Sequence, residues 1–425
     1  MSWGYRSAGF LPRVVNGCRA SGILLLTTVA SLGLGLAATS ANAQIVTLPV
    51  CNDRLTTDCQ IGGIIGIVPE VPVALQQVLG EDVTNPDVLG LVYRQAAALS
   101  QLANTTKSAA LGVTQDIVTG VLDVALAPQL FAVPAPFGVS SPGSASSMFM
   151  VSGYKHLSHD GYSVASDFGP ALGKTPGFEE DDFGLTLGTR FDGSDVFGSE
   201  EGSVVFGVLG NYTHTDIDVD ALNFAGKLKN GSASIDSWSV GGYGLVTDGV
   251  RYGLVTLTGT FGSPEIENAL SAKADFGTFG LAASAVSGVL VPVGSAKLDL
   301  RGGLNYLHAS SDDYTDSLGS HYTDGRMEEF SGSLSARLFG LVRLDEYNVR
   351  PFIQGGLNHR FHYENEITVD DATFNFDDAD TSVFGRAGID FDVDQFIQAY
   401  LSVRGDASED VAAIAAQVGV TFKLD

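Results

Sequence analysis

The sequence predicts an all-β chain in which a twelve-stranded antiparallel transmembrane β-barrel follows a short, partly helical N-terminal region. Three observations support this fold class. From about Met148 to the C-terminus, runs of roughly 8–14 residues place apolar side chains at every second position. No helical pattern separates these runs, and the gaps between them alternate between long and short. Because successive strand residues face opposite sides of a sheet, each run has one apolar and one polar face.

The alternation is clearest in two of these runs. Leu298, Leu300 and Leu304 alternate with Asp299 and Arg301, and a second run from Leu334 to Val342 repeats the pattern. A soluble sheet can show the same alternation. A dozen such strands, with no helices to cover their apolar side, are more typical of a closed barrel whose apolar side meets lipid.

Composition excludes two other classes of protein. Acidic residues number 49 against 23 basic ones, and the net charge of −26 argues against a nucleic-acid partner. No apolar run of 18 or more residues follows the N-terminal region, so a helical membrane protein is not expected.

Residues 1–43 predict a secretory signal peptide. Arg6, Arg13 and Arg19 supply positive charge, residues 23–38 are apolar, and Ala41-Asn42-Ala43 is a cleavage site of the A-x-A type. An N-terminal membrane anchor is the alternative. A signal peptide implies Sec-type export into an oxidising compartment, so we expect Cys51 and Cys59 to form a disulfide.

Residues 44–146 form a second, passenger-like region. It is irregular up to about Pro86, and apolar residues then recur at helical spacing from Val88 to about Leu126. A Pro- and Ser-rich linker follows, from Pro128 to Ser147. The barrel then occupies residues 147–425.

The alternation predicts twelve strands, an even number that places both ends of a barrel on one side. They are expected near 147–155, 181–191, 203–214, 233–246, 250–261, 274–290, 296–308, 328–343, 348–362, 381–392, 396–404 and 411–424. Gaps on the outward side are expected to be long, at about 156–180, 215–232, 262–273, 309–327, 363–380 and 405–410. Most inward gaps are expected to be short turns, such as Thr247-Asp248-Gly249.

Six arginines fall on the polar side of the predicted strands. Charge on the lipid side would cost about 2–4 kcal/mol per Arg at the membrane midplane, so we expect these residues to line the lumen. They are Arg301, Arg337, Arg350, Arg360, Arg386 and Arg404. A polar conduit and an internal salt-bridge brace both remain open. Aromatic residues recur at strand ends on the apolar side, among them Tyr212, Tyr306 and Phe361, as in interfacial girdles.

These patterns resemble the C-terminal translocator domain of bacterial autotransporters. The run Ser239-Val240-Gly241-Gly242-Tyr243-Gly244, followed by Tyr252-Gly253-Leu254, is similar to a glycine- and tyrosine-rich hairpin of that family, and Ala415 to Phe422 resembles its last strand. The resemblance implies an outer-membrane protein of a Gram-negative bacterium that translocates or anchors an N-terminal segment at the cell surface. It also implies contact with outer-membrane lipid, lipopolysaccharide and the barrel-assembly machinery, and no cofactor.

The chain departs from the family in three ways. The family's last strand usually ends on an aromatic residue, whereas Leu424 and Asp425 follow Phe422 here. The region before the barrel is short, while family members usually carry a large passenger. The family's pore helix runs close to the first strand, whereas the Pro- and Ser-rich linker intervenes here.

The sequence predicts no enzyme, since it has no Gly-x-Ser-x-Gly motif. Two sets of residues could form a surface hydrolase site or bind metal, although hydrated loop residues are the simpler interpretation. They are His156, His159 and Asp160, and His214, Asp216 and Asp218. The acidic outward loops could also bind divalent cations weakly. Alternatives to passenger export are a porin-like or structural surface barrel, and a barrel enzyme acting on lipid or peptide.

Overall fold

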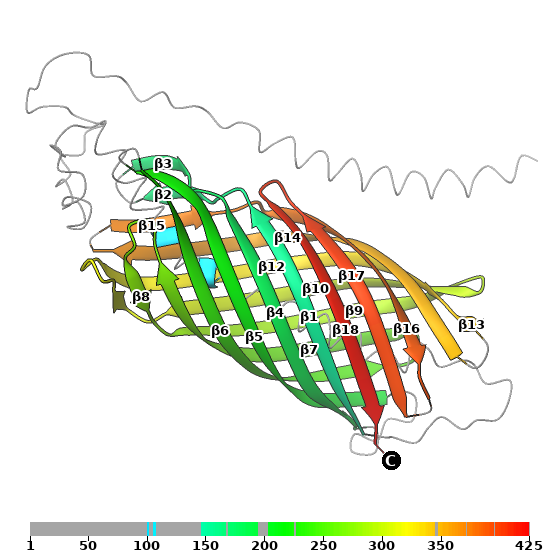
Figure 1. The fold of residues 1–425 in the computed structure, drawn as a ribbon. Coiled ribbons are helices and arrows are strands. Elements are labelled where there is room, and N and C mark those ends of the chain that lie inside the picture. The colour runs from blue at the N-terminus through cyan, green and yellow to red at the C-terminus, as the bar shows by residue number, and fades with distance from the viewer. Residues whose placement is uncertain are drawn as a thin grey trace, which may run out of the picture. The chain divides into compact units, whose positions relative to one another are not determined.

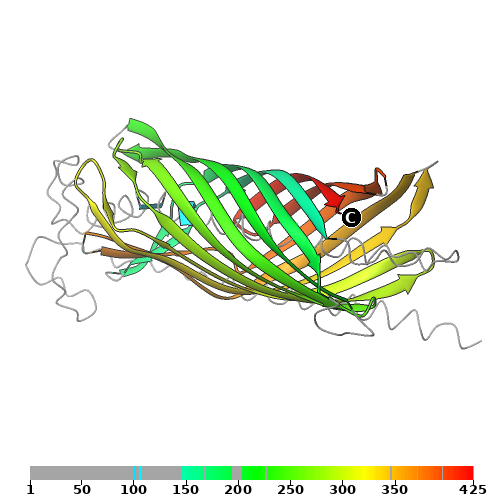
Figure 2. The ribbon, with the colours of Figure 1, turned by 90° about the horizontal axis from the view of Figure 1, so that it is seen from below.

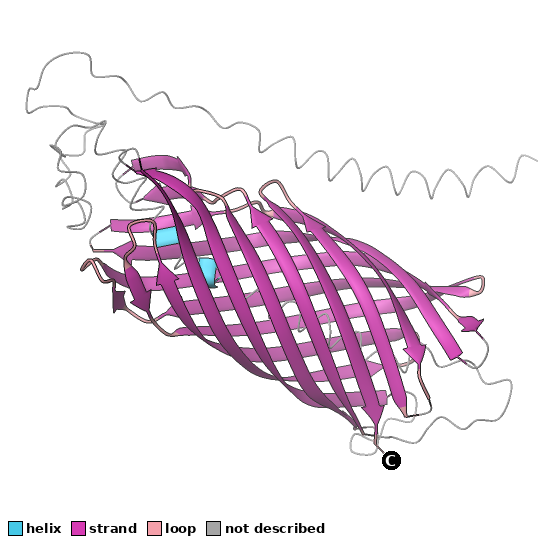
Figure 3. Cartoon of the chain, viewed as in Figure 1, coloured by secondary structure: helices cyan, strands magenta, loops and turns pink. Residues whose placement is uncertain are grey.

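A computed structural model describes residues 100–101, 105–107, 146–166, 169–193, 203–224, 227–344, 347–370, 372–394 and 396–424. All of them belong to the second of two compact units, Val68–Asp425. Strands make up nearly all of the described chain. The five described residues that precede the barrel, 100–101 and 105–107, are helical (Figure 3). The predicted all-β class is therefore confirmed.

Within the described residues, twelve long strands form one closed antiparallel wall (Figure 1). They are β1 (Ser147–His159), β4 (Phe178–Asp192), β5 (Ser203–Phe224), β6 (Lys227–Thr247), β7 (Arg251–Glu267), β9 (Thr278–Val293), β10 (Ala296–Ser311), β12 (His321–Gly340), β14 (Tyr347–Val369), β16 (Thr381–Asp392), β17 (Ile397–Ala407) and β18 (Val411–Lys423). The first strand closes the ring, because β1 pairs with β18 over its whole length and with β4 on its other edge. Seen from below in Figure 2, the tilted strands again form one continuous wall.

The inner end of the barrel, where β1 begins and β18 ends, has short turns. Asp248, Gly249 and Val250 join β6 to β7, and Gly249 adopts a φ of +84°, which glycine accepts without a steric penalty. The Asp248 carboxylate accepts hydrogen bonds from the backbone N–H groups of Val250 (2.9 Å) and Arg251 (2.6 Å). These turns agree with the short inward gaps that the sequence predicts.

The outer end differs from the prediction, because the strands continue far beyond the expected boundaries. The predicted outward gap 215–232 is wrong, since β5 runs to Phe224 and β6 starts at Lys227. Here the polarity of the alternation inverts: Ile217 and Val219 point inward and are buried, while Asp216 and Asp218 point outward. β5 therefore continues as a strand where its outward side is no longer apolar.

Six short strands complete the described fold: β2 (Ser163–Ser166), β3 (Gly169–Lys174), β8 (Lys273–Asp275), β11 (Tyr314–Thr315), β13 (Val342–Leu344) and β15 (Ala372–Asp377). All but β13 lie in the outward connections. Of these, β15 pairs with both β14 and β2, so that two connections far apart in the sequence lie side by side at the outer rim.

Inward-facing apolar side chains form two main clusters. The outer cluster includes Tyr162, Phe178, Ile217, Ile235, Phe374 and Phe376. The inner cluster includes Phe149, Leu245, Tyr252, Leu254, Phe352 and Tyr400. Polar and charged side chains occupy the lumen between and among these clusters, which makes the lumen the candidate functional site.

Candidate functional site: the lumen

The barrel wall has an apolar outside and a polar inside over most of its height. On β10 and β12, Leu300 and Leu338 are 41% and 38% exposed on the outside, whereas Asp299 and Arg337 are 0% and 2% exposed on the inside. Leu300 and Leu338 would be buried between the layers of a sandwich of soluble sheets. The alternation found in the sequence therefore corresponds to the two faces of a closed wall.

Three of the six selected arginines lie in the inner part of the lumen, and each pairs with an aspartate. Arg301 binds Asp299, two residues before it on β10, and Asp299 also accepts a hydrogen bond from Tyr252 at 2.8 Å. Arg337 lies 3.2 Å from a carboxylate oxygen of Asp390, and its guanidinium carbon lies 3.7 Å from the centre of the Phe352 ring.

The pair between Arg350 and Asp392 is bidentate. The two guanidinium nitrogens Nη1 and Nη2 of Arg350 contact the two Asp392 carboxylate oxygens at 2.8 and 2.7 Å. Parallel hydrogen bonds of this kind fix the plane of the guanidinium as well as its position. Side chains of β14 and β16 are thereby joined inside the wall.

The other three arginines, Arg386, Arg404 and Arg360, also face the lumen. Arg386 donates to Ser402 (2.8 Å) and Gln417 (3.2 Å), linking β16, β17 and β18. Arg404 contacts Asp406 at 2.6 Å, and Arg360 contacts Glu329 at 3.1 Å and Asp378 at 2.9 Å. All six arginines therefore have an acidic or polar partner in the described lumen.

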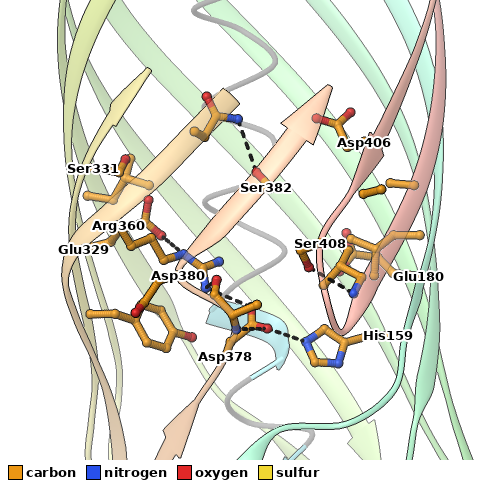
Figure 4. Close-up of a pocket in the computed structure, with 18 of the residues that line it drawn as sticks. His159, Glu180, Glu329, Ser331, Arg360, Asp378, Asp380, Ser382, Asp406 and Ser408 are labelled. Atoms are coloured by element: carbon orange, nitrogen blue, oxygen red, sulfur yellow. Dashed lines mark hydrogen bonds and ion pairs between the residues drawn. The ribbon is translucent and has the colours of Figure 1, made fainter. Parts of the chain in front are cut away.

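A cavity of about 220 Å³ opens in the outer half of the lumen (Figure 4). Arg360 and Glu329 lie on one side of it and His159 and Glu180 on the other, with Asp378 between Arg360 and His159. On the β1–β4 side, Lys155 Nζ lies 2.8 Å from Glu180 and 3.1 Å from Asp182. The cavity is thus lined by charged groups that pair across neighbouring strands.

Asp390 was expected on the polar face beside the arginines, but Glu329, Asp378 and Asp392 were not. The inward positions of each strand contain them: Glu329 and Arg337 lie on the same face of β12, and Asp390 and Asp392 on the same face of β16. The alternation of inward and outward side chains along each strand would have placed Glu329 and Asp392 on the polar side. Asp378 follows β15 in an irregular connection, and no periodic signal marks it.

Asp378 contacts His159 of β1 and Arg360 of β14. Burial alone would raise the pKa of the Asp378 carboxyl, but the hydrogen bond from His159 and the charge of Arg360 outweigh burial and hold this pKa well below its usual range. Asp378 is therefore ionised at neutral pH and fixes the position of Arg360 at the cavity.

The described helical residues before the barrel lie inside its outer half. Gln101 donates a hydrogen bond to the backbone oxygen of Pro176 (2.8 Å), and Lys107 Nζ donates to those of Arg326 (3.2 Å) and Glu366 (3.0 Å). Ser100, Gln101 and Thr105–Lys107 are all 0% exposed. Burial lowers the pKa of Lys107 to about 7, against the opposing charge of Glu366.

The structure does not bring the two predicted histidine sets together. His156 faces outward and contacts Asp181 (2.9 Å), whereas His159 faces the lumen. The Nδ1 atom of His159 accepts the Gly161 N–H and its Nε2 atom faces Asp378, so neither nitrogen is directed at a nucleophile. His214 contacts Asp236 (3.0 Å) on the outer surface.

Asp216, Asp218 and Asp220 point outward from β5 rather than forming a calcium-binding loop. In the part of the chain that the structure describes, no group of three or more His, Cys, Asp or Glu residues could hold a metal ion. Cys51 and Cys59, the expected disulfide, lie outside the described residues.

Exposed aromatic side chains form a row around the outside of the wall, at the level where the alternation inverts. Register aligns Tyr154 with Phe183, Tyr212 with Trp238 and Phe261, and Tyr306 with Phe330. Charged residues such as Asp181, Asp236 and Arg326 lie beyond this row. Such a row is typical of a girdle at the boundary between hydrocarbon and water.

A closed antiparallel wall with an apolar outside, an aromatic girdle and a charged lumen defines a transmembrane β-barrel. Among the described residues, no helix has the length and apolar character needed to cross a membrane. The chain belongs to the autotransporter β-domain family, whose model matches residues 168–404, more than half of the chain. It is an outer-membrane β-barrel of the autotransporter type, which translocates or anchors an N-terminal segment at the surface of a Gram-negative bacterium.

Solved structures of two translocators share this fold. The transport unit of the autotransporter AIDA-I from Escherichia coli is 17% identical, with a TM-score of 0.53, and the match covers 72% of this chain and 97% of that one. The translocator domain of the autotransporter NalP from Neisseria meningitidis is 12% identical, also with a TM-score of 0.53, and the match covers 75% of this chain and 99% of that one. No curated protein sequence matches the chain.

Proposed function

We propose that the segment this barrel delivers to the surface is its own N-terminal region, residues 44–146. The observation that supports this proposal is the position of Gln101 and Lys107, which are fully buried in the outer half of the lumen. Gln101 is hydrogen-bonded to the connection before β4, and Lys107 is hydrogen-bonded to the wall. A segment that has passed through the barrel would leave its C-terminal part in the lumen. Closure of the wall satisfies the backbone hydrogen bonds in lipid without any cofactor.

The six lumenal arginines act, in this proposal, as a brace rather than as a conduit. Arg337 and Arg350 are each 4% exposed or less and pair with Asp390 and Asp392 across strands. Cations that are neutralised and held in this way contribute little to the field felt by a passing chain. Their contribution would instead be to hold neighbouring strands at a fixed register.

The test is the location of the N-terminal region on intact cells. We expect an epitope tag inserted after Asp53 to be reached by antibody and by protease before the outer membrane is permeabilised. The matched control is the same tag inserted between Asp248 and Gly249 in an inner turn, which should become accessible only after permeabilisation. A tag after Asp53 that also needs permeabilisation would contradict export of this segment.

That negative result would support the alternative, a porin-like or structural surface barrel whose N-terminal region stays in the periplasm. The shortness of the region between residues 44 and 146 favours this second candidate.

We further propose that the protein is not an enzyme. The outward position of His156 and His214 and the engaged nitrogens of His159 support this view. Replacing all three histidines by Ala should then leave surface hydrolysis of lipid or peptide unchanged. Lipopolysaccharide and the barrel-assembly machinery are the partners expected of such a barrel, and crosslinking from β1 and β18 during assembly would test the second of them.

A further inference from the structure

A short sheet at the outer end of the barrel joins two distant connections. β15 pairs with β14 on one edge and with β2 on the other, through four residue pairs in each case. In the ring of wall strands, β16, β17 and β18 separate the connection that contains β15 from the connection that contains β2. The two short strands therefore link the rim across the outer ends of these three strands (Figure 1). β2 and β15 together form the rim panel.

Inward-facing side chains of the rim panel belong to the apolar cluster that fills the outer end of the lumen. Phe374 and Phe376 of β15 and Val164 of β2 are buried. They lie in the same cluster as Ile217 of β5 and Ile235 of β6, which are each 1% exposed. A close-packed core of this kind leaves no space for a moving chain. A segment could therefore pass this end of the lumen only if part of the cluster moved aside.

Ring contacts and one carboxylate hold the panel in place. Phe376 meets the Tyr162 ring edge-on, with ring centres 6.0 Å apart, and Tyr162 contacts the His159 ring at the end of β1 at 4.6 Å. Asp378, which directly follows β15, lies 3.5 Å from His159 Nε2 and 2.9 Å from Arg360 of β14. The panel is therefore fastened to the wall largely by side chains.

The backbone pairing of the panel is short, and space lies beside it. Among the described wall strands the shortest ladder, between β16 and β17, has ten residue pairs, against four on each edge of β15. The cavity of about 220 Å³ is lined by Tyr162 and Asp378 at the panel and by Ser408 in the turn after β17. Few pairs and adjacent space are the conditions under which a part of a protein opens locally, without unfolding of the rest.

The N-terminal region contacts the connection that contains β2. Gln101 Nε2 donates to the backbone oxygen of Pro176, between β3 and β4, at 2.8 Å. Lys107 Nζ donates to backbone oxygens of β12 and β14, at 3.2 and 3.0 Å. These two buried residues therefore tie the connection that contains β2 to the wall, and they favour the closed position of the panel once they have reached the outer half of the lumen.

We propose that the rim panel is a gate for the N-terminal region. It moves away from the apolar cluster while residues 44–99 leave the lumen, and it returns when Gln101 and Lys107 dock. The closed panel then holds the exported segment and seals the outer end of the barrel. This inference rests on the export proposed above, because it names the part of the barrel that moves during that export.

Native-state hydrogen exchange of the purified full-length protein in detergent tests the opening without reference to export. After correction for intrinsic rates, amides of β2 and β15 should exchange at least about tenfold faster than those of β9 and β10. Phe374→Ala/Phe376→Ala should accelerate exchange of β2 by a further factor of about ten. The matched control is Thr373→Ala/Asn375→Ala, at the alternate positions of the same strand, which should not. Equal protection of panel and wall would overturn the gate.

A disulfide that locks the panel tests whether export requires its opening. Ala165 and Asn375 are paired across β2 and β15 on the outward face, and paired strand residues lie within the span of a disulfide. The variant Ala165→Cys/Asn375→Cys is made in a chain whose native cysteines are serine and which carries the tag after Asp53. Under oxidising growth, antibody should detect about tenfold less tag on intact cells than with wild type. Reductant added after protein synthesis is stopped should restore the signal.

The matched control is Thr368→Cys/Thr373→Cys, which joins β14 to β15 within one hairpin and leaves β2 unbound. This variant should export the tag with or without reductant. Full export by a completely oxidised panel lock would overturn the gate and leave the export of residues 44–146 intact. A tag that stays inside in wild type and in both cysteine variants, even after reduction, would instead refute the export and with it the role of the gate, while the exchange measurement shows separately whether the panel opens.

Discussion

At the scale of single residues, the inner lumen is packed by aromatic rings that lie over glycines of the neighbouring strand. A Cβ on Gly388 would stand 2.6 Å from the Phe352 ring, and one on Gly288 would stand 2.4 Å from Tyr252. The Arg337 guanidinium lies over the face of the same Phe352 ring. Glycine, ring and arginine therefore form one packed unit between β12, β14 and β16.

We expect Gly388→Val to destabilise the barrel by about 1–3 kcal/mol, because the new side chain overpacks a closed site. Its Cβ would also approach the Leu401 carbonyl oxygen to 2.5 Å, and backbone cannot move aside cheaply. Urea unfolding in detergent measures the effect. Gly385→Val on the same strand has open space and should be close to neutral, so equal losses in both variants would contradict this explanation.

Arg337→Ala should cost about 3–5 kcal/mol of unfolding free energy, because it removes a buried cation from beside the buried Asp390 carboxylate. The double variant Arg337→Ala/Asp390→Ala should lose less than the sum of the two single variants in the same urea experiment. Strictly additive losses would argue against the brace and for an independent role of each residue.

The sequence identifies which side of the wall these arginines occupy, but not their partners. Parity along one strand is enough to place Arg337 and Asp390 on the polar side. Their contact also depends on the register between β12, β14 and β16, which is set by pairing and by a bulge near Phe330. The Asp378 contact with Arg360 depends on an irregular connection and has no periodic signal at all.

At the scale of elements, the inner turns fix the hairpins through local hydrogen bonds. Backbone N–H groups of Arg251 and Val250 donate to Asp248 and hold the pKa of its carboxyl below the usual range. A depressed carboxyl pKa stabilises the turn above the unfolded value, about 3.9, and this contribution is lost as pH falls through the folded value.

We therefore expect amide hydrogen exchange at Val250 and Arg251 to become faster, after correction for intrinsic rates, when pH falls below about 4. Asp248→Asn keeps an acceptor oxygen but does not titrate, and should remove this acid dependence. An identical acid response in the asparagine variant would show that another group titrates.

The lengths of the outer strands were the part of the fold that the sequence predicted least well. Thr215-Asp216-Ile217-Asp218-Val219 alternates as regularly as any strand, but with its apolar residues facing inward. The same residues suggested an acidic loop, because a barrel in lipid was expected to be apolar outside. Beyond the girdle the surroundings are aqueous, and the apolar side of the strand then packs inward, as in a soluble sheet.

At the scale of the whole molecule, the barrel holds part of its own N-terminal region through a buried lysine. Burial lowers the pKa of Lys107 to about 7, while an unfolded lysine titrates near about 10.4. At a pH between these two pKa values, Lys107 is protonated when it is undocked and neutral when it is docked. Docking therefore becomes more stable as pH rises from about 7 towards 10.

Hydrogen exchange of residues 105–107 should accordingly indicate a larger opening free energy at pH 9 than at pH 7. Lys107→Met keeps the apolar stem without the amine and should show no such difference. A pH response that survives in the methionine variant would mean that Glu366 or another neighbour is responsible.

The inversion of polarity at the girdle has a consequence for how each strand finds its place. If β5 slipped by one position against its neighbours, Asp216 and Asp218 would turn towards the outer cluster, and Val208 and Tyr212 would turn into the lumen at the same moment. A single shift in register would therefore bury charged side chains at the outer end and place apolar side chains in the polar lumen within the membrane. The boundary between water and lipid therefore favours one register of β5 against its neighbours during barrel assembly.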